Sequence, residues 1–267
     1  MSNIARVFQD SKSRCEGVLI GYMMAGDPNP QTTTRIADAL IKGGIDILEV
    51  GLPFSDPIAD GPTIQASSVR ALAAGTSPIK VLEIVKQVKL KLDVPIIIMT
   101  YYNPVFRIGV ERFCRLARDC MVDGLIIPDL PVEEAADYRK AAAAQGLDTI
   151  FLAAPSTTNE RLAKIIDVSS GFLYLISQYG VTGAKMTVED STLRLIKCVK
   201  PYTENKIPLA VGFGISKPEH VKKIIQAGAE GAIVGSAFIN IVQKNHKDML
   251  QQLKATAAEL KAATRTC

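Results

Sequence analysis

The chain has 267 residues, of which 48% are hydrophobic and 22% are charged, and its formal net charge is +4. This balance is typical of an ordinary globular protein, and the lysines are scattered along predicted helices, so we expect neither nucleic acid nor a membrane as a partner. The N-terminal segment carries charged and polar residues where a signal peptide needs an apolar run, so we expect a cytoplasmic protein.

Apolar strands alternate with segments of helical spacing along the chain. A short amphipathic helix is predicted around residues 4–10, then a strand over Val18–Met24, a helix over Thr32–Lys42 and a strand over Ile45–Val50. Further strands are expected at Pro95–Met99, Gly124–Ile127, Thr149–Leu152, Phe172–Ile176, Leu209–Val211 and Gly231–Val234. Further helices are expected at Ile64–Ala74, Ile79–Leu92, Val110–Met121, Glu133–Gln145, Asn159–Ile166, Val188–Val199 and Pro218–Ala227, with a short one after Ser236 and a long one over Asp248–Lys261.

This rhythm predicts an α/β fold of about eight strands, each followed by a helix. Continuous apolar strands joined by helical crossovers require a parallel sheet that is buried on both faces. We therefore expect a single (β/α)8 TIM barrel over residues 1–267, with an extra N-terminal helix and a short helix before the final helix. An open doubly wound sheet is the alternative, but Gly26-Asp27-Pro28 after the first strand is not the glycine-rich turn typical of a nucleotide-binding sheet.

In such a barrel the active site lies at the C-terminal ends of the strands. No lysine stands at a predicted strand end, which disfavours Schiff-base chemistry. The two histidines, His220 and His246, fall in the last two helical regions, so we predict no histidine-bound metal. Carboxylates and phenols are left for proton transfer.

Two acids stand out around the second strand. Glu49 is a lone carboxylate in a buried apolar strand, where it must find a partner or keep its proton with a raised pKa. Asp60 follows on a loop rich in glycine, proline and aspartate. The alternatives are a structural hydrogen-bond acceptor for Glu49 and a cap of the following helix for Asp60. Asp56 and Asp129 have the plainer interpretation of turn formers beside prolines, and Tyr174 that of a core residue.

Glycines after the last two strands indicate an anion site. Gly212-Phe213-Gly214-Ile215-Ser216 and Gly235-Ser236 each precede a helical segment, whose N-terminal amides attract anions. Residues 180–183, GVTG, could fold over the same group as a lid. From the residues alone we expect a phosphorylated metabolite and acid–base catalysis, in an isomerase or a lyase.

The segments LEVGLPFSDPIADGPTIQ, YLISQYGVTG, GFGIS and GSAF, in this order and spacing, resemble the tryptophan synthase alpha chain family over essentially the whole length. The resemblance implies a retro-aldol cleavage of indole-3-glycerol phosphate to indole and glyceraldehyde 3-phosphate. The indole ring, protonated at C3, would then serve as the electron sink.

The resemblance also implies roles for individual residues. Glu49 would shuttle protons at the indole carbon and the glycerol hydroxyl, and Asp60 would accept a hydrogen bond from the indole N–H. Thr182 would hydrogen-bond Asp60 on lid closure, and Tyr174 would lie near the reacting end of the substrate. The phosphate positions would be Gly183, Phe213, Gly214, Gly235 and Ser236. The indole pocket would be lined by Tyr22, Met99, Tyr101, Ile126 and Leu152.

Finally, the resemblance implies a partner, a pyridoxal-phosphate (PLP) beta chain, in an α2β2 heterotetramer. Asp56 and residues 131–135 would lie at or near the shared surface, and no cofactor is expected in this chain. Two residues depart from the family pattern: Gln178 stands where many members have arginine, and Met24 where many have threonine. A barrel that only activates the beta chain, or a phosphosugar isomerase, is the alternative function.

Overall fold

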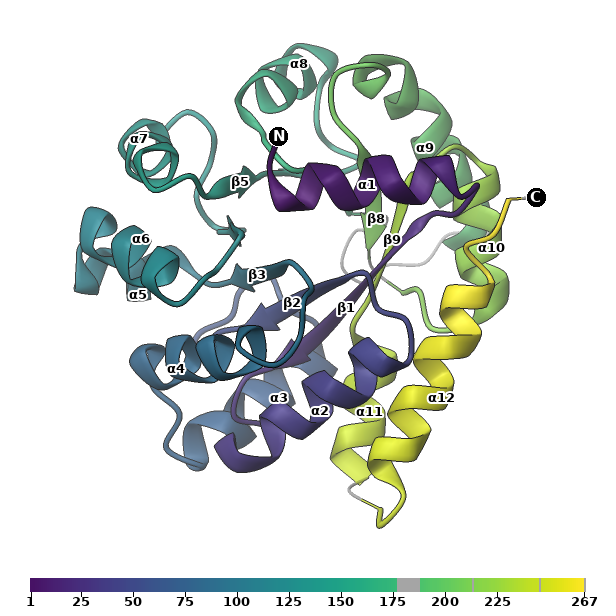
Figure 1. Ribbon diagram of the computed structural model, residues 1–267. Helices are drawn as coiled ribbons and strands as arrows, with labels where there is room; N and C mark the ends of the chain where they lie inside the picture. Colours follow the sequence, from purple (N-terminus) through teal and green to yellow (C-terminus); the bar gives the residue numbers. More distant parts are fainter. Residues whose placement is uncertain (177–187, 213, 245, 267) are drawn as a thin grey trace.

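The computed structural model describes residues 1–176, 188–212, 214–244 and 246–266, apart from the side chains at 188 and 189. The described strands all run parallel in one sheet, and helices lie around its outside (Figure 1). The strand segments are β1 (Val18–Met24), β2 (Ile47–Gly51), β3 (Ile96–Met99), β4 (Gly124–Ile126), β5 (Asp148–Ile150), β6 (Leu152–Ala153), β7 (Leu173–Ile176), β8 (Leu209–Gly212) and β9 (Gly231–Val234).

The sheet closes into a barrel through one interrupted strand. In the order β5-β4-β3-β2-β1-β9-β8-β7-β6, the first and last segments are separated in sequence by Phe151 alone. β5 pairs with β4, β6 pairs with β7, and the Phe151 carbonyl accepts a hydrogen bond from the Tyr174 amide at 3.1 Å. The segments β5 and β6 are therefore two halves of one strand. This closure confirms the predicted (β/α)8 barrel and excludes the open sheet.

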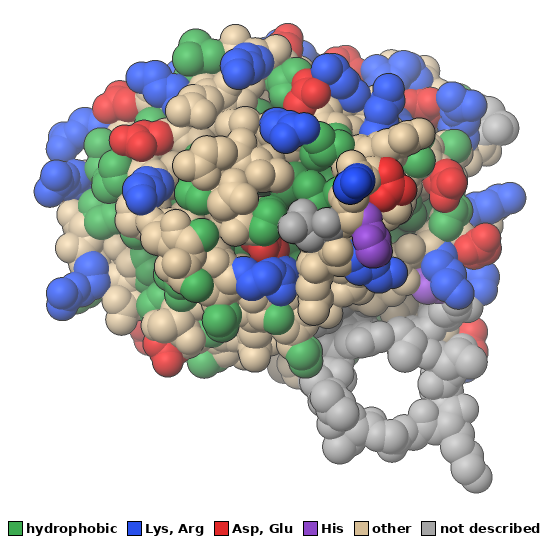
Figure 2. Space-filling model, turned by 90° about the horizontal axis from the view of Figure 1, so that it is seen from below, with side chains coloured by type: hydrophobic (Ala, Val, Ile, Leu, Met, Phe, Trp, Pro, Cys, Tyr) green, Lys and Arg blue, Asp and Glu red, His purple; other side chains and the backbone are tan. Residues whose placement is uncertain are grey.

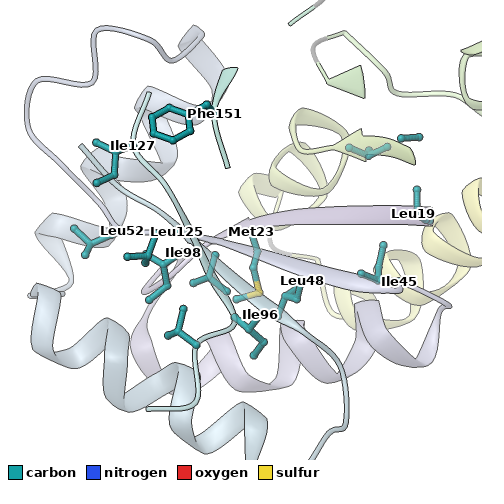
Figure 3. Close-up of a cluster of buried hydrophobic side chains, with 14 of the residues drawn as sticks. Leu19, Met23, Ile45, Leu48, Leu52, Ile96, Ile98, Leu125, Ile127 and Phe151 are labelled. Carbon is teal, nitrogen blue, oxygen red and sulfur yellow. The ribbon is translucent and has the colours of Figure 1, made fainter. Parts of the chain in front are cut away.

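The two faces of the strands carry different side chains because successive residues of a strand point to opposite faces. Outward-pointing residues pack under the helices, and Figure 3 labels ten members of this cluster. Those on the strands or directly beside them include Leu19, Met23, Leu48, Ile96, Ile98, Leu125, Ile127 and Phe151. The barrel interior is filled by a second cluster that includes Val18, Ile20, Ile47, Ile97, Ile126, Ile150, Phe172, Tyr174, Ala210 and Ile233.

Helix α1 (Asn3–Ser13) closes the N-terminal end of the barrel (Figure 1). The Ser2 hydroxyl caps the helix by accepting a hydrogen bond from the Ala5 amide. Ile4 and Phe8 are buried and join the interior cluster, and the Phe8 ring centroid lies 5.7 Å from that of Phe172. An apolar plug therefore fills this end.

The remaining described helices surround the barrel. Four of them, α2, α3, α4 and α10, have proline as their first residue, where the missing N–H would have no partner within the helix. None of the helices described combines the length and the apolar character that crossing a membrane requires. Their bounds are α2 (Pro30–Lys42), α3 (Pro62–Ala73), α4 (Pro78–Lys89), α5 (Tyr102–Ile108), α6 (Val110–Asp119), α7 (Ala136–Ala144), α8 (Asn159–Val168), α9 (Val188–Thr203), α10 (Pro218–Gln226), α11 (Ser236–Lys244) and α12 (Met249–Ala262).

Helix ends differ from the prediction by up to four residues, as at the end of α9, and two departures have a clear physical reason. Helix α5 is not predicted, because its seven residues are too few to produce a recognisable apolar repeat. Helix α7 begins at Ala136 rather than at Glu133. The reason is a turn over residues 131–135, in which the Glu134 amide donates to the Pro131 carbonyl.

Charged side chains are dispersed over the surface that Figure 2 shows. Lysine and arginine side chains alternate there with acidic, hydrophobic and uncharged polar ones. A nucleic-acid-binding face would instead gather its basic residues into a stripe or patch. On this face the distribution agrees with the low net charge of +4.

Candidate active site

A cavity opens at the C-terminal ends of the strands. Its volume is about 100 Å³, which is enough to hold several water molecules or the polar groups of a ligand. Two carboxylates, two phenols and a glycine-rich edge meet in its wall. The lining residues are Tyr22, Glu49, Asp60, Gly61, Ile64, Met99, Tyr174, Gly214, Ile215, Ile233, Gly235 and Ser236.

Glu49 lies in the centre of β2 and points into the barrel. Strand pairing places it opposite Tyr22 of β1 and Ile97 of β3, and its side chain is only 1% exposed. Neither carboxylate oxygen has a hydrogen-bond partner among the described residues. Burial, and then the charge of Asp60, raise the pKa of Glu49 from 4.5 to about 8. Glu49 therefore carries a proton at neutral pH.

Asp60 reaches the same cavity from the loop between β2 and α3. Burial raises the pKa of Asp60 from 3.8 to about 6, while a hydrogen bond from the Tyr101 hydroxyl opposes that rise. Helix α3 is preceded by Gly61, and no side chain caps it, so the helix-cap interpretation of Asp60 does not hold. The two acids thus differ in protonation at neutral pH: Glu49 is neutral and Asp60 is ionised.

The loop that carries Asp60 is fixed at several points along its length. The Phe54 amide donates to the Ser68 hydroxyl at 2.8 Å, and this hydroxyl donates to the Phe54 carbonyl at 2.8 Å. The Phe54 ring stacks on Tyr101 with centroids 5.4 Å apart, and the Ala59 amide donates to the Tyr101 hydroxyl at 3.0 Å. These contacts limit the positions that the Asp60 carboxylate can occupy.

Two tyrosines, Tyr22 of β1 and Tyr174 of β7, line the cavity. Tyr22 and Tyr174 are buried, and burial, followed by the nearby carboxylates, raises the pKa of both phenols. Each ring lies against a glycine of a neighbouring strand, Tyr22 against Gly51 and Tyr174 against Gly212. A Cβ at either glycine would overlap the phenol oxygen, so both strands need glycine there. The phenols therefore stay neutral, and they can contribute hydrogen bonds and ring contacts rather than act as bases.

The third side of the cavity is suited to an anion. Gly214 has φ +73°, a left-handed conformation that favours glycine. Ser236 is the first residue of α11, and the preceding Gly235 carbonyl accepts the amides of Phe238 and Ile239. The first-turn amides of this helix are the donors that a phosphate oxygen can use.

Not all of the predicted residues can be followed to the described lining of the cavity. Thr182, Gly183, Phe213 and Gln178 fall outside the described residues. The described lining of the cavity does not include Tyr101, Ile126 or Leu152. Ile126 and Leu152 belong to the cluster that fills the barrel, and Tyr101 lies behind Asp60 as its hydrogen-bond partner. The departure Met24 is buried, with its sulfur 4.0 Å from the Tyr22 hydroxyl.

Part of the cavity lining, and most of the residues that fix the lining in place, are not among the residues predicted from the sequence. Gly61, Ile64 and Ile233 line the cavity without a polar signal in the sequence. Arg70 of α3 forms a bidentate ion pair with the buried Asp27 after β1, with distances of 2.7 and 2.8 Å. Arginine on a helix is usually read as solvent-facing, so only the three-dimensional fold shows this pair.

Within the part of the chain that the structure describes, no three His, Cys, Asp or Glu side chains gather in an arrangement that could hold a metal ion. The cavity instead combines one neutral carboxyl, one carboxylate, two phenols and an anion-binding edge. This set can donate a proton, accept one and hold an anionic group at the same time.

The sequence from residue 8 to residue 265 matches the family model of the tryptophan synthase alpha chain. The tryptophan synthase alpha chain of Methanosarcina barkeri is 49% identical over 259 residues, which cover 97% of this chain and 96% of that relative. A chain of the Pyrococcus furiosus tryptophan synthase complex is 41% identical with a TM-score of 0.84, covering 92% of this chain and 98% of that one. A chain of Mycobacterium tuberculosis tryptophan synthase is 37% identical with a TM-score of 0.90, covering 100% and 99%. The chain belongs to the tryptophan synthase alpha chain family.

Proposed function

We propose that Glu49 and Asp60 catalyse the lyase reaction of this family, the cleavage of indole-3-glycerol phosphate to indole and glyceraldehyde 3-phosphate in tryptophan biosynthesis. The observation that carries the proposal is the difference between the two acids. Glu49 is buried, has no hydrogen-bond partner among the described residues and is protonated at neutral pH, and Asp60 is ionised in the same cavity. One group can therefore give a proton while the other stabilises positive charge.

The reaction begins with proton transfer from the Glu49 carboxyl to C3 of the indole ring. The ring nitrogen then bears positive charge, and C3 becomes a leaving group because the ring can take back the bonding electrons. The Glu49 carboxylate next removes the proton of the adjacent glycerol hydroxyl. The carbon–carbon bond breaks, the hydroxyl carbon becomes the aldehyde of glyceraldehyde 3-phosphate, and indole is released. Glu49 ends protonated, as it began.

Asp60 acts on the other side of the indole ring. Its carboxylate accepts a hydrogen bond from the ring N–H and stabilises the positive charge that develops when C3 is protonated. The Tyr101 hydroxyl keeps Asp60 ionised by donating a hydrogen bond to it. Tyr22, Met99 and Tyr174 supply flat and apolar contacts for the ring and the reacting end.

The phosphate binds at the glycine-rich edge. Gly214, Gly235 and Ser236 line the cavity, and α11 directs its N-terminal amides toward it. Gly183 and Phe213 are predicted to complete this edge. Separately, Thr182 is predicted to donate a hydrogen bond to Asp60. Arginine or lysine is not required there, because amide donors at a helix N-terminus bind phosphate by themselves.

We further propose a beta chain as the partner, in an α2β2 heterotetramer within the cytoplasm, with PLP bound to the beta chain. One of the related solved structures is the tryptophan synthase complex of Pyrococcus furiosus. The proposed contact surface comprises Asp56 and residues 131–135. An exposed apolar side chain two residues from Asp56 supports it, because Ile58 is 82% exposed. Sedimentation of this chain with and without a beta chain tests the assembly.

The reaction is tested by measuring indole release from indole-3-glycerol phosphate by wild type and Glu49→Gln. The amide is nearly isosteric but cannot transfer the proton, so indole release should fall at least a thousandfold with the fold intact. Glu83→Gln on the exposed side of α4 is the matched control and should leave the rate unchanged.

Three results would contradict the proposal. Near wild-type indole release by Glu49→Gln would remove the glutamate from the mechanism. Silence of the wild type, both alone and with a beta chain, would favour a barrel that only activates its partner. An aldose–ketose exchange without indole would instead indicate a phosphosugar isomerase.

A further inference from the structure

Asp129 makes a hydrogen bond that its place in a proline-flanked turn does not predict. Its Oδ1 atom accepts the amide hydrogen of Tyr102 at 2.8 Å. Tyr102 is the first residue of α5, and Tyr101, which precedes this helix, provides no side-chain cap. Asp129 therefore caps α5 from the loop after the neighbouring strand β4, 27 residues away in sequence.

The residue before this capped amide bonds to the catalytic loop. The Tyr101 hydroxyl accepts a hydrogen bond from the Ala59 amide at 3.0 Å and donates one to the Asp60 carboxylate. Its ring stacks on Phe54 of the same loop. Tyr101 is only 3% exposed, so its ring has little freedom to reorient. The orientation of Tyr101 thus depends on the backbone at residues 101 and 102.

The backbone on the other side of Tyr101 is also fixed by the strand β4. The Thr100 amide donates to the Ile126 carbonyl at 2.9 Å, which continues the pairing between β3 and β4. Residues 100–102 are therefore bound to β4 and its loop at both ends, once through Ile126 and once through Asp129. The second of these contacts uses a side chain, so it can be removed by substitution without changing the strand.

We propose that Asp129 is a positioning residue for the lyase reaction: through the Tyr102 amide it sets the Tyr101 hydroxyl, and through that hydroxyl it sets the Asp60 carboxylate. The part of this inference that concerns turnover rests on the proposed function of Asp60. The structural link is independent of that function, because it predicts a change in the titration of Asp60 that can be measured without substrate.

The direction of that change follows from the hydrogen bond. A donor to the carboxylate stabilises its ionised form, so a displaced Tyr101 hydroxyl raises the pKa of Asp60 above about 6. Burial and the charge of Asp60 raise the pKa of Tyr101, and the charge of Asp129 adds a smaller rise. Among the described residues, the titratable groups that face Asp60 are Glu49, Tyr22, Tyr101 and Tyr174.

The experiment titrates Asp60 by carboxyl carbon NMR in wild type, Asp129→Ala and Asp129→Asn. The alanine removes the acceptor, and the midpoint of Asp60 should move to higher pH. The asparagine keeps an oxygen at the acceptor position, so its midpoint should stay near that of the wild type. Asp137→Ala, which removes an exposed first-turn acid from α7, is the matched control and should cause no shift.

Turnover gives the second measurement. The acid limb of the pH profile should move upward in Asp129→Ala, with kcat reduced roughly tenfold at pH 6 and less at pH 8. In a Tyr101→Phe background the alanine should add no further shift, because the hydroxyl that transmits the effect is gone. An additive shift in the double variant would contradict the link.

An unchanged Asp60 midpoint in folded Asp129→Ala overturns the inference, whatever the activity. If that variant does not fold, Asp129→Glu replaces it, since it keeps the charge and displaces the acceptor by one methylene; an unchanged midpoint there also overturns the inference. If Asp129→Ala shifts the Asp60 midpoint but the wild type releases no indole, the structural link stands and the proposed function is rejected. The two failures are therefore distinct.

Discussion

Two buried carboxylates, one toward each end of the barrel, are held in opposite ways. At the N-terminal end, Asp123 accepts hydrogen bonds from Asn3 at 2.7 Å, from the Ile96 amide at 2.8 Å and from Lys89 at 2.9 Å. At the C-terminal end, Glu49 is buried to a similar degree and has no partner among the described residues. A carboxylate with three donors holds neighbouring elements together. One without donors keeps its proton and can pass it on.

This difference makes the first acid a stability element and the second a catalytic one. The stability of a protein depends on satisfied buried charges, whereas proton transfer requires a group that the fold leaves unsatisfied. The comparison predicts that substitutions at the N-terminal end change unfolding without changing turnover. Substitutions at the C-terminal end should change turnover without lowering the free energy of unfolding.

The largest expected effect is on stability, from Lys89→Met. The ion pair with Asp123 is buried, with side chains 12% and 6% exposed. Removing the cation leaves a buried charge with one partner fewer, so the free energy of unfolding should fall by about 3 kcal/mol. Urea denaturation measures this loss, and kcat should stay within about twofold of wild type at a temperature where the variant is folded.

The matched control for Lys89 is Lys42→Met on α2. Lys42 pairs with Asp38 at 2.9 Å, but these side chains are 60% and 41% exposed. An exposed pair contributes little, so this variant should lose no more than about 0.5 kcal/mol. Equal losses in the two variants, or a fall in turnover with unchanged stability in Lys89→Met, would break the comparison.

Asp60→Asn tests the opposite end. The amide cannot stabilise positive charge on the indole ring, so turnover should fall about a hundredfold, equivalent to about 2.7 kcal/mol. The free energy of unfolding should not fall, because Asp60 does not cap α3. Steady-state indole release and urea denaturation on the same samples separate the effects. Lower stability with unchanged turnover would restore the helix-cap interpretation.

The sequence predicts the architecture well because periodicity is a local property. The strands Val18–Met24 and Gly231–Val234 were predicted with the bounds that the structure shows. The break at Phe151 was not, because a strand that is interrupted by one residue keeps the same apolar pattern. Helix α5 was missed for the complementary reason, since its cap comes from Asp129 in another loop.

The candidate site likewise has one part that the sequence could predict and one part that it could not. Glu49 could be found because a lone acid interrupts an apolar strand. The geometry of Asp60 could not, because it depends on contacts between distant segments, such as Tyr101 with Ala59 and Phe54 with Ser68. No spacing rule connects these residues. The same limit applied to Arg70, whose partner Asp27 lies 43 residues away.

The pKa of Glu49 gives a stability prediction with a definite sign. The folded value of about 8 lies above the unfolded value near 4.5, so the native state binds more protons between these values and stability falls as pH rises through this window. Glu49→Gln cannot ionise. The free energy of unfolding of Glu49→Gln, taken relative to that of wild type, should therefore rise by on the order of 2–3 kcal/mol from pH 5 to pH 8.

Urea denaturation of both proteins at the two pH values measures this gain. Asp60 is present in both, so its own titration largely cancels. Glu83→Gln should show the same small difference from wild type at pH 5 and pH 8, because Glu83 is exposed. A pH-independent difference for Glu49→Gln would mean that Glu49 ionises normally and would end the contrast with Asp123.

The smallest expected effect is the pH dependence of wild-type turnover, and it tests both acids together. The reaction needs Asp60 ionised and Glu49 protonated, and their pKa values of about 6 and about 8 define a window between them. Turnover should therefore peak near pH 7 and fall about tenfold by pH 5, where Asp60 gains its proton, and by pH 9, where Glu49 loses its own. Asp60→Asn should abolish the acid limb and retain the basic one. A profile with both limbs intact in that variant would assign the acid limb to another group, and the division of roles between the two carboxylates would be wrong.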